Sequence, residues 1–285
     1  MPIEALLLVF LSALLHTWWN YFVKTVREKQ IFTWWTLAVG CVFYIPLIML
    51  NWPIPSAVWP YVAGSALAEA IYFIVLIRAY QHGDFSLVYP VARGAAPAML
   101  TVWAVLFLGE RPEPGGFAGL SVLIIGLILV GGAGLLTRRT SFSVGVSELC
   151  PALVISFWIS VYSVLDGAAV RIMAPESYAG LVLAITAMLL TPVVISRYGI
   201  RAIAEEFHLN WVRIVAVAFM MLLTFILVLE AYRIGKVSYV AATREISVIL
   251  ASLVGWRLMK EEFGRIRTAG SVLIFLGILL IAITG

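Results

Sequence analysis

The chain has 285 residues, of which 63% are hydrophobic and only 12% are Asp, Glu, Lys or Arg. Soluble domains are typically about 45–50% apolar and about 25% charged, so this composition excludes soluble enzymes, nucleic-acid-binding proteins and disordered scaffolds. The net charge of +4 is expected to reside in loops between membrane spans, where basic residues record the direction of insertion. We therefore predict an all-α polytopic membrane protein.

Apolar runs of about 20 residues, the length that a helix needs to cross about 30 Å of hydrocarbon, succeed one another along the whole chain. The first run lacks a basic leading region and an A-x-A-like cleavage site, so we expect it to be a retained membrane helix. The connections are too short to hold a soluble domain, and any function must lie among the helices. Glycine, proline and charged residues delimit ten predicted spans, at 2–24, 31–50, 58–82, 85–108, 114–136, 147–170, 177–197, 210–234, 237–260 and 264–284.

Lysine and arginine are distributed unequally between the loops. Loops after even-numbered spans hold four of them, whereas loops after odd-numbered spans hold thirteen. The positive-inside rule then places the odd-numbered loops in the cytoplasm and both termini outside. The thirteen are Lys24, Arg27, Lys29, Arg78, Arg138, Arg139, Arg197, Arg201, Arg213, Arg257, Lys260, Arg265 and Arg267, and the four are Arg111, Arg171, Arg233 and Lys236.

The two halves of the sequence share one pattern. The motif Ala79-Tyr80-x-x-Gly83-x-x-Ser86 recurs 152 positions later as Ala231-Tyr232-x-x-Gly235-x-x-Ser238. Each half holds five predicted spans, and because five is odd, the second half must enter the membrane upside down. The sequence thus predicts two inverted five-helix repeats, at 1–140 and 141–285, which is an architecture typical of transporters. Further matches are Glu110 with Glu262 at offset 152, Gly119 and Gly126 with Gly270 and Gly277 at 151, and His16 and Asn20 with Tyr162 and Asp166 at 146.

Three segments carry a family resemblance: Leu15-His16-Thr17-Trp18-Trp19-Asn20, the stretch from Arg78 to Gly94, and Leu108-Gly109-Glu110-Arg111. Together they resemble the EamA family of the drug/metabolite transporter superfamily, and the resemblance covers the chain as two EamA repeats. It implies ten helices, a substrate in a central cavity, and secondary transport of small metabolites, often amino acids leaving the cell. Members are usually drawn with cytoplasmic termini, so the charge count departs from the family pattern.

Ionisable residues inside predicted spans each cost about 2.5–3.5 kcal/mol on insertion scales, and four of them stand out: Glu69, Arg93, Arg244 and Glu245. The inverted repeat brings Arg93 and Arg244 in from opposite faces toward the midplane, and Tyr89 shares a helix face with Arg93. One interpretation is two structural ion pairs. The other is that one or both guanidinium groups bind an anionic group of a substrate, in a site that also contains Glu245 and Tyr89, while Glu69 carries a coupling proton or is permanently paired.

A polar pattern on the first helix is repeated on the sixth. His16 and Asn20, with Trp19 on much the same side, are matched by Tyr162 and Asp166 at the same spacing. This duplication favours the lining of a substrate cavity, and proton transfer by His16 remains the alternative interpretation. Interfacial anchoring is the default interpretation of tryptophans near helix ends, against a cavity that surrounds a cation.

The predicted function is secondary transport, gradient-driven or facilitated, of a small polar metabolite by alternating access around a central midplane cavity in the cell inner membrane. Candidate substrates are an amino acid or another zwitterion or anion, such as an aminophosphonate. Rival functions are an intramembrane enzyme acting on a lipid or peptide, and an uncoupled channel or facilitator. We expect no cofactor, metal, ATP or nucleic acid. The expected partners are the small-molecule substrate and the lipid bilayer, with the proton as a candidate coupling ion and a monomer or homodimer as the assembly.

Overall fold

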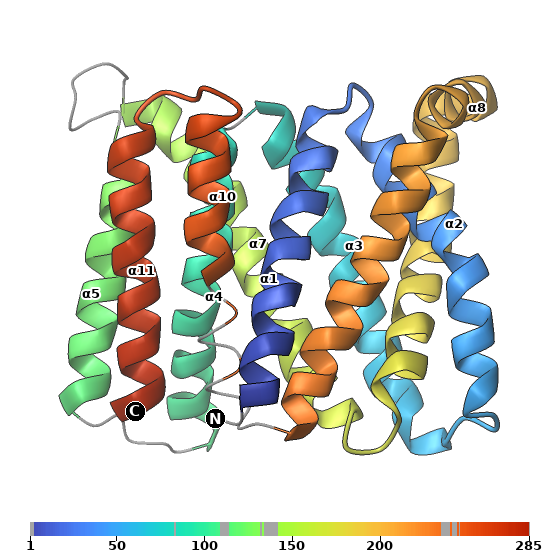
Figure 1. The fold of residues 1–285 in the computed structure, drawn as a ribbon, viewed down its shortest axis with the longest axis horizontal. Coiled ribbons are helices and arrows are strands. Elements are labelled where there is room, and N and C mark those ends of the chain that lie inside the picture. The colour runs from blue at the N-terminus through green and yellow to red at the C-terminus, as the bar shows by residue number, and fades with distance from the viewer. Residues whose placement is uncertain are drawn as a thin grey trace. The chain divides into compact units, whose positions relative to one another are not determined.

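The computed structural model describes residues 3–82, 84–108, 114–131, 133, 142–234, 240, 244 and 246–284. Over these residues the chain is helical and contains no strand (Figure 1). The all-α class is confirmed, whereas the predicted ten helices are not, because the described residues form nine α-helices and one short 3-10 helix. These are α1 (Ile3–Thr25), α2 (Lys29–Leu50), η1 (Ser56–Val58), α3 (Trp59–His82), α4 (Phe85–Leu108), α5 (Pro114–Gly131), α7 (Phe142–Ala169), α8 (Pro175–Ile234), α10 (Ile246–Arg257) and α11 (Gly264–Thr284).

Most helix bounds agree with the predicted spans. Helices α1, α2, α3, α4 and α11 begin and end within two residues of the prediction, while α7 begins at Phe142 instead of 147. Helix α5 ends at Gly131, and residues 132 and 134–141, which include the predicted end of that span, lie outside the described residues. Residues 237–239, 241–243 and 245 of the predicted span 237–260 also lie outside the described residues, and α10 covers the centre of that span.

Five described helices are long and apolar enough to cross a membrane, and shorter apolar helices accompany them at Gly115–Val130 and Ile246–Arg257. The chain is therefore a multi-pass membrane protein. The five are Ile3–Thr25, Lys29–Leu50, Ser56–Tyr80, Leu149–Ala169 and Pro175–Ile234.

Helix α8 covers two predicted spans at once. At 1.5 Å per residue, 60 straight helical residues would extend about 90 Å, three times the hydrocarbon thickness of about 30 Å. Gly199 breaks the helix with φ 73° and ψ 160°, a conformation that side chains disfavour. Two legs result, and Figure 1 shows the chain turning across the upper end of α8 between them. The predicted loop between 197 and 210 therefore remains helical apart from this one residue.

The turn at Gly199 is held by the beginning of α2. Ile31 of α2 packs with Val194 and Ile203, which lie on either side of the turn. The Trp35 indole nitrogen donates to the Ile203 carbonyl oxygen at 2.8 Å, and the Trp34 indole nitrogen donates to the Thr191 hydroxyl at 2.9 Å. These two tryptophans thus secure the contact between α2 and α8.

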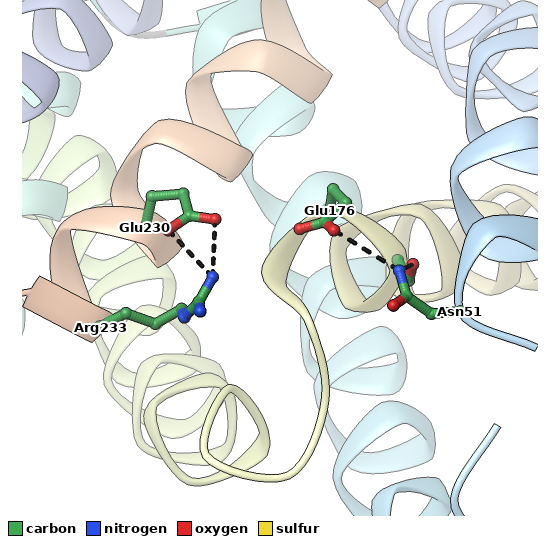
Figure 2. A network of polar contacts seen from close by, with 5 residues as sticks. Asn51, Glu176, Glu230 and Arg233 are labelled. Carbon is green, nitrogen blue, oxygen red and sulfur yellow. Dashed lines mark hydrogen bonds and ion pairs between the residues drawn. The ribbon is translucent and has the colours of Figure 1, made fainter.

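The other end of the α2–α8 contact is closed by polar side chains (Figure 2). The Asn51 amide nitrogen donates to the Ser177 hydroxyl at 2.7 Å and lies 3.5 Å from the Glu176 carboxylate, while Ser177 donates to the Leu47 carbonyl oxygen. At the end of α8, Arg233 pairs with Glu230 at 3.1 Å. Of these contacts, the one from Ser177 satisfies a backbone carbonyl oxygen in the last turn of α2.

The chain divides into two compact units, and each takes segments from both predicted repeats. Unit 1 contains Arg78–Ser160 and Lys236–Gly285, with α4, α5, most of α7, α10 and α11. Unit 2 contains Pro2–Ile77 and Val161–Gly235, with α1, α2, most of α3, the end of α7, and α8.

Within unit 1, helices α5 and α11 approach closely at glycines that the sequence repeat had matched. A Cβ atom on Gly126 would lie 2.7 Å from the Gly270 carbonyl oxygen, and one on Gly277 would lie 2.7 Å from the Gly119 carbonyl oxygen. Ordinary contacts of a Cβ atom begin at about 3.4 Å, so only glycine permits this spacing. In the sequence repeat, Gly126 corresponds to Gly277 and Gly119 corresponds to Gly270. The repeat therefore maps each of these two contacts onto the other, as an inverted repeat requires.

Candidate functional site

The predicted site residues divide between the two units. His16, Trp19, Asn20, Glu69, Tyr162 and Asp166 belong to unit 2, whereas Tyr89, Arg93 and Arg244 belong to unit 1. Glu245 lies outside the described residues. Glu69 and Asp166 therefore lie in unit 2, whereas the predicted guanidinium groups of Arg93 and Arg244 lie in unit 1.

Asp166 is the centre of a buried hydrogen-bond network in unit 2. Its Oδ1 atom accepts a hydrogen bond from the Ser65 hydroxyl at 2.6 Å and another from the Tyr178 hydroxyl at 2.7 Å. The three side chains come from α3, α7 and α8 and are at most 2% exposed. Both distances lie within the usual range of O–H···O hydrogen bonds, about 2.5–3.0 Å, so both hydroxyls bond directly to Asp166.

Glu69 belongs to the same helix interface as Asp166. On α3, residues Ser65, Glu69 and Tyr72 lie on one face because they are spaced at i, i+4 and i+7. Ser65 bonds to Asp166 at one end of this face, and the Tyr72 ring contacts the Tyr162 ring at 5.9 Å at the other end. Glu69, which is 7% exposed, therefore lies between two contacts that α3 makes with α7.

Two further contacts fix the spacing around this interface. A Cβ atom on Gly64 would lie 3.0 Å from the Leu165 side chain, so α3 and α7 pack tightly beside Ser65. The Thr186 hydroxyl of α8 donates to the Ala66 carbonyl oxygen at 3.3 Å. Helices α3, α7 and α8 thus converge on one buried polar region of unit 2.

The predicted cavity residues of α1 contact one another. The Asn20 side-chain nitrogen donates to the His16 carbonyl oxygen at 2.8 Å and lies 3.1 Å from His16 Nδ1. The centroids of the Trp19 and His16 rings lie 4.9 Å apart, and the centroids of the Trp19 and Phe73 rings lie 6.5 Å apart, with Phe73 on α3. His16, Trp19 and Asn20 are all buried, so in this unit Trp19 is an interior residue.

In unit 1, Tyr89 and Arg93 lie one turn apart on α4 and are both buried. The residues that flank Arg93 are tightly packed. A Cβ atom on Gly94 would lie 2.5 Å from the Ile274 side chain of α11, and the Ser156 hydroxyl of α7 donates to the Ala92 carbonyl oxygen at 2.8 Å. Neighbouring helices therefore fix the position of Arg93 along the bundle.

Arg244 is a half-buried helical residue that precedes α10, a helix that packs on α4 within unit 1. Its Nε atom is shielded from solvent and has no hydrogen-bond partner among the residues that the structure describes. A buried guanidinium nitrogen of this kind is available to an acceptor of a ligand. The approach of Arg93 to Arg244 stays a prediction, as does their role in binding.

Some residues of the polar region were absent from the sequence prediction. Ser65 precedes Glu69 by one turn on α3, so the helical spacing of polar residues could have found it. Tyr178 could not have been found in this way, because it lies on another helix, twelve positions after Asp166, and meets it through the turn between α7 and α8. Across the described residues, no group of three or more His, Cys, Asp or Glu side chains could hold a metal ion.

Comparison with known proteins gives a family match over both halves of the chain. A model described as the EamA-like transporter family matches residues 3–132 and 147–283. No curated protein matches the chain. A solved structure described only as "Crystal structure of protein" is similar to it, with 18% identity, a TM-score of 0.66, and 98% of each chain covered. At this identity the likeness shows the fold alone.

Proposed function

We propose that this chain, which belongs to the EamA-like transporter family of the drug/metabolite transporter superfamily, is a secondary transporter of a small polar metabolite in the cell inner membrane. The observation that carries the proposal is the family match over both halves of a multi-pass protein. Buried ionisable residues support it, because such residues are costly in a membrane and mark transport pathways. Neither an intramembrane enzyme nor a channel is favoured by the comparisons.

The substrate proposed is a zwitterion or anion, namely an amino acid or an aminophosphonate. Arg93 and Arg244 support an anionic group, because a guanidinium binds a carboxylate or phosphonate through two parallel hydrogen bonds. The burial of Arg93 and the shielding of the Arg244 Nε atom from solvent favour this role, since water competes less for such bonds inside a protein. If both arginines are instead structural ion-pair partners, their substitution by lysine should leave substrate affinity unchanged.

The proposed mechanism is alternating access, which is typical of carriers built from inverted repeats. The exchanging repeats are proposed to be 1–140 and 141–285, and Glu69 is the proposed carrier of a coupling proton. The burial of Glu69 on α3 supports this assignment, because ionisable residues buried among membrane helices are costly and often mark ion or proton pathways. Energy is proposed to come from an ion or substrate gradient.

The experiment is counterflow in proteoliposomes that contain the purified full chain. Vesicles loaded with an unlabelled compound are diluted into the same compound in labelled form, with a panel of amino acids and 2-aminoethylphosphonate as probes. A transporter gives transient, saturable accumulation of label for at least one probe. Equilibration without an overshoot for every probe, or chemical conversion of a probe, contradicts the proposal.

A further inference from the structure

The leg of α8 that follows Gly199 is longer than one membrane crossing requires. It continues to Ile234, so at 1.5 Å per residue it extends about 52 Å, against a hydrocarbon thickness of about 30 Å. Its polar residues are concentrated in 201–210, whereas 211–229 holds a single charged residue. The first turns of this leg therefore lie outside the hydrocarbon, and Figure 1 shows them across the upper end of α8.

One face of these first turns packs on the rest of unit 2. Ile203 packs against Ile31 of α2, and its carbonyl oxygen accepts a hydrogen bond from the Trp35 indole nitrogen at 2.8 Å. The centroids of the Trp35 and Phe207 rings lie 4.7 Å apart. These contacts hold the segment at the end of unit 2 where α1 ends and α2 begins.

The remaining surface of the segment is amphipathic, because an apolar row and a polar row run side by side along it. Ile200 and Trp211, at the two ends of the apolar row, are 76% and 55% exposed. The rows are about 100° apart around the helix, so a helix lying along a bilayer can turn one row to hydrocarbon and the other to water. The apolar row is Ile200, Ala204, Phe207 and Trp211, and the polar row is Arg201, Glu205 and His208.

Basic side chains predominate at this end of unit 2. Among the described residues, 24–29 and 197–213 together hold six lysines and arginines against three glutamates, whereas the opposite end of the unit holds two arginines against three glutamates. The six are Lys24, Arg27, Lys29, Arg197, Arg201 and Arg213, against Glu28, Glu205 and Glu206, and the opposite end holds Arg171 and Arg233 against Glu4, Glu176 and Glu230. An excess of positive charge beside an amphipathic helix attracts an anionic lipid surface.

Two arginines on either side of Gly199 are placed to contact such a surface. Arg197 lies over the Tyr198 ring at 5.5 Å, and the Tyr198 hydroxyl donates to Gln30 at 3.1 Å, which ties this position to α2. Arg201 is 94% exposed and pairs only with the exposed Glu205 among the described contacts, a kind of pair that contributes little to stability. A guanidinium group binds a phosphate through two parallel hydrogen bonds.

We propose that residues 200–211 form an interfacial helix that lies along the membrane surface, and that Arg197 and Arg201 beside it bind the headgroup phosphates of anionic phospholipids. The lipid binds the folded turn at Gly199 and so stabilises the contact between α2 and α8. This role does not depend on any transported compound.

Thermal melts of the purified full chain test the lipid contact. Nanodiscs of phosphatidylcholine are compared with nanodiscs of phosphatidylcholine and phosphatidylglycerol, which differ in charge. Phosphatidylglycerol should raise Tm, and high salt should reduce this increase. The double variant Arg197→Gln/Arg201→Gln should lose roughly half of the increase or more, whereas Arg197→Lys/Arg201→Lys, which keeps the charge, should retain most of it.

The matched control is Arg171→Gln/Arg233→Gln, which removes the same charge from the opposite end of unit 2. It should retain the full increase in Tm on addition of phosphatidylglycerol. Because the increase is compared within each variant, a change in its basal Tm does not affect the comparison.

Spin labels test how the segment lies. In a chain whose two cysteines, Cys41 and Cys150, are replaced by alanine, a nitroxide is attached at Ile200→Cys in the apolar row or at His208→Cys in the polar row. The label at position 200 should collide mainly with oxygen dissolved in the lipid. The label at position 208 should collide mainly with a water-soluble nickel complex.

The proposal is overturned if phosphatidylglycerol leaves Tm unchanged, or if the double glutamine variant keeps the same increase as the wild type. Equal access of nickel to both labels would place the segment in water or against a soluble partner and would overturn it as well. Failure of counterflow would contradict the proposed function and leave the melts and the label accessibilities unaffected, so the two failures are distinguishable.

Discussion

Adding one methyl group to the α5–α11 contact should destabilise unit 1. In Gly126→Ala, the new Cβ would lie 2.6 Å from the Ile274 backbone nitrogen and 2.7 Å from the Gly270 carbonyl oxygen. Both neighbours are backbone atoms of α11 and cannot rotate away, so the helices must separate by roughly 0.8 Å to reach ordinary contact distance. Overpacking of this kind typically costs about 1–3 kcal/mol, which lowers Tm by roughly 2–10 °C for a chain of this size.

The control is Gly167→Ala in α7, where a Cβ would meet nothing within 4 Å. There alanine brings only its better helix propensity, about 0.5–1 kcal/mol, and Tm should stay level or rise slightly. Thermal melts of the purified full chain in one detergent compare the variants. A Gly126→Ala protein that melts at or above the wild-type temperature would refute the close approach of α5 and α11.

The repeat relation adds a second test of the same contact. Gly270 presents the same surroundings from α11, with a Cβ position 2.8 Å from the Gly126 carbonyl oxygen. Gly270→Ala should therefore lower Tm by a similar amount. The double variant should lose less than the sum of the single losses, because the separation forced by one methyl group makes room for the other.

Other predictions concern topology and the charged residues. A C-terminal phosphatase fusion should be active and a fluorescent fusion dark, and the reverse result would place both termini in the cytoplasm. Glu69→Gln should abolish proton-driven accumulation while sparing substrate exchange, and normal accumulation would return Glu69 to a structural role. Arg93→Lys and Arg244→Lys should each weaken substrate affinity at least tenfold in well-folded protein. The control Arg233→Lys, which changes an exposed ion pair, should leave the affinity unchanged. Normal binding by both site variants would contradict an anion site. Burial raises the pKa of Glu206, so the stability that its protonated form contributes is lost as the pH rises through that pKa. Glu206→Gln should therefore flatten the dependence of Tm on pH, and an unchanged profile would contradict this prediction.

The sequence located helices and buried charges because both leave local signals. An apolar run long enough to cross a bilayer is visible without any knowledge of its neighbours, and so is a Glu69 or Asp166 within such a run. The partners of these charges are not visible in the same way. Tyr178 contacts Asp166 because the turn between α7 and α8 returns the chain, and no periodicity encodes that return.

The turn in α8 illustrates the opposite limit. Charged residues between 197 and 210 indicated a break between two spans, but only Gly199 leaves the helical conformation. The rest of this segment can remain helical because it packs on α2 through Trp35, Ile31 and Ile203. Tertiary packing, which composition does not report, decides whether a polar connection is a loop or a helix.

The contact between α5 and α11 also bears on the number of membrane crossings. Gly119 lies against Gly277 and Gly126 against Gly270, so position increases along one helix as it decreases along the other, and the two helices are antiparallel. An antiparallel pair requires an odd number of crossings from the end of α5 to the end of α11. Counting α8 as one span gives four, whereas counting its two legs separately gives five. The packing of two helices in unit 1 thus supports counting the two legs of α8 as separate crossings.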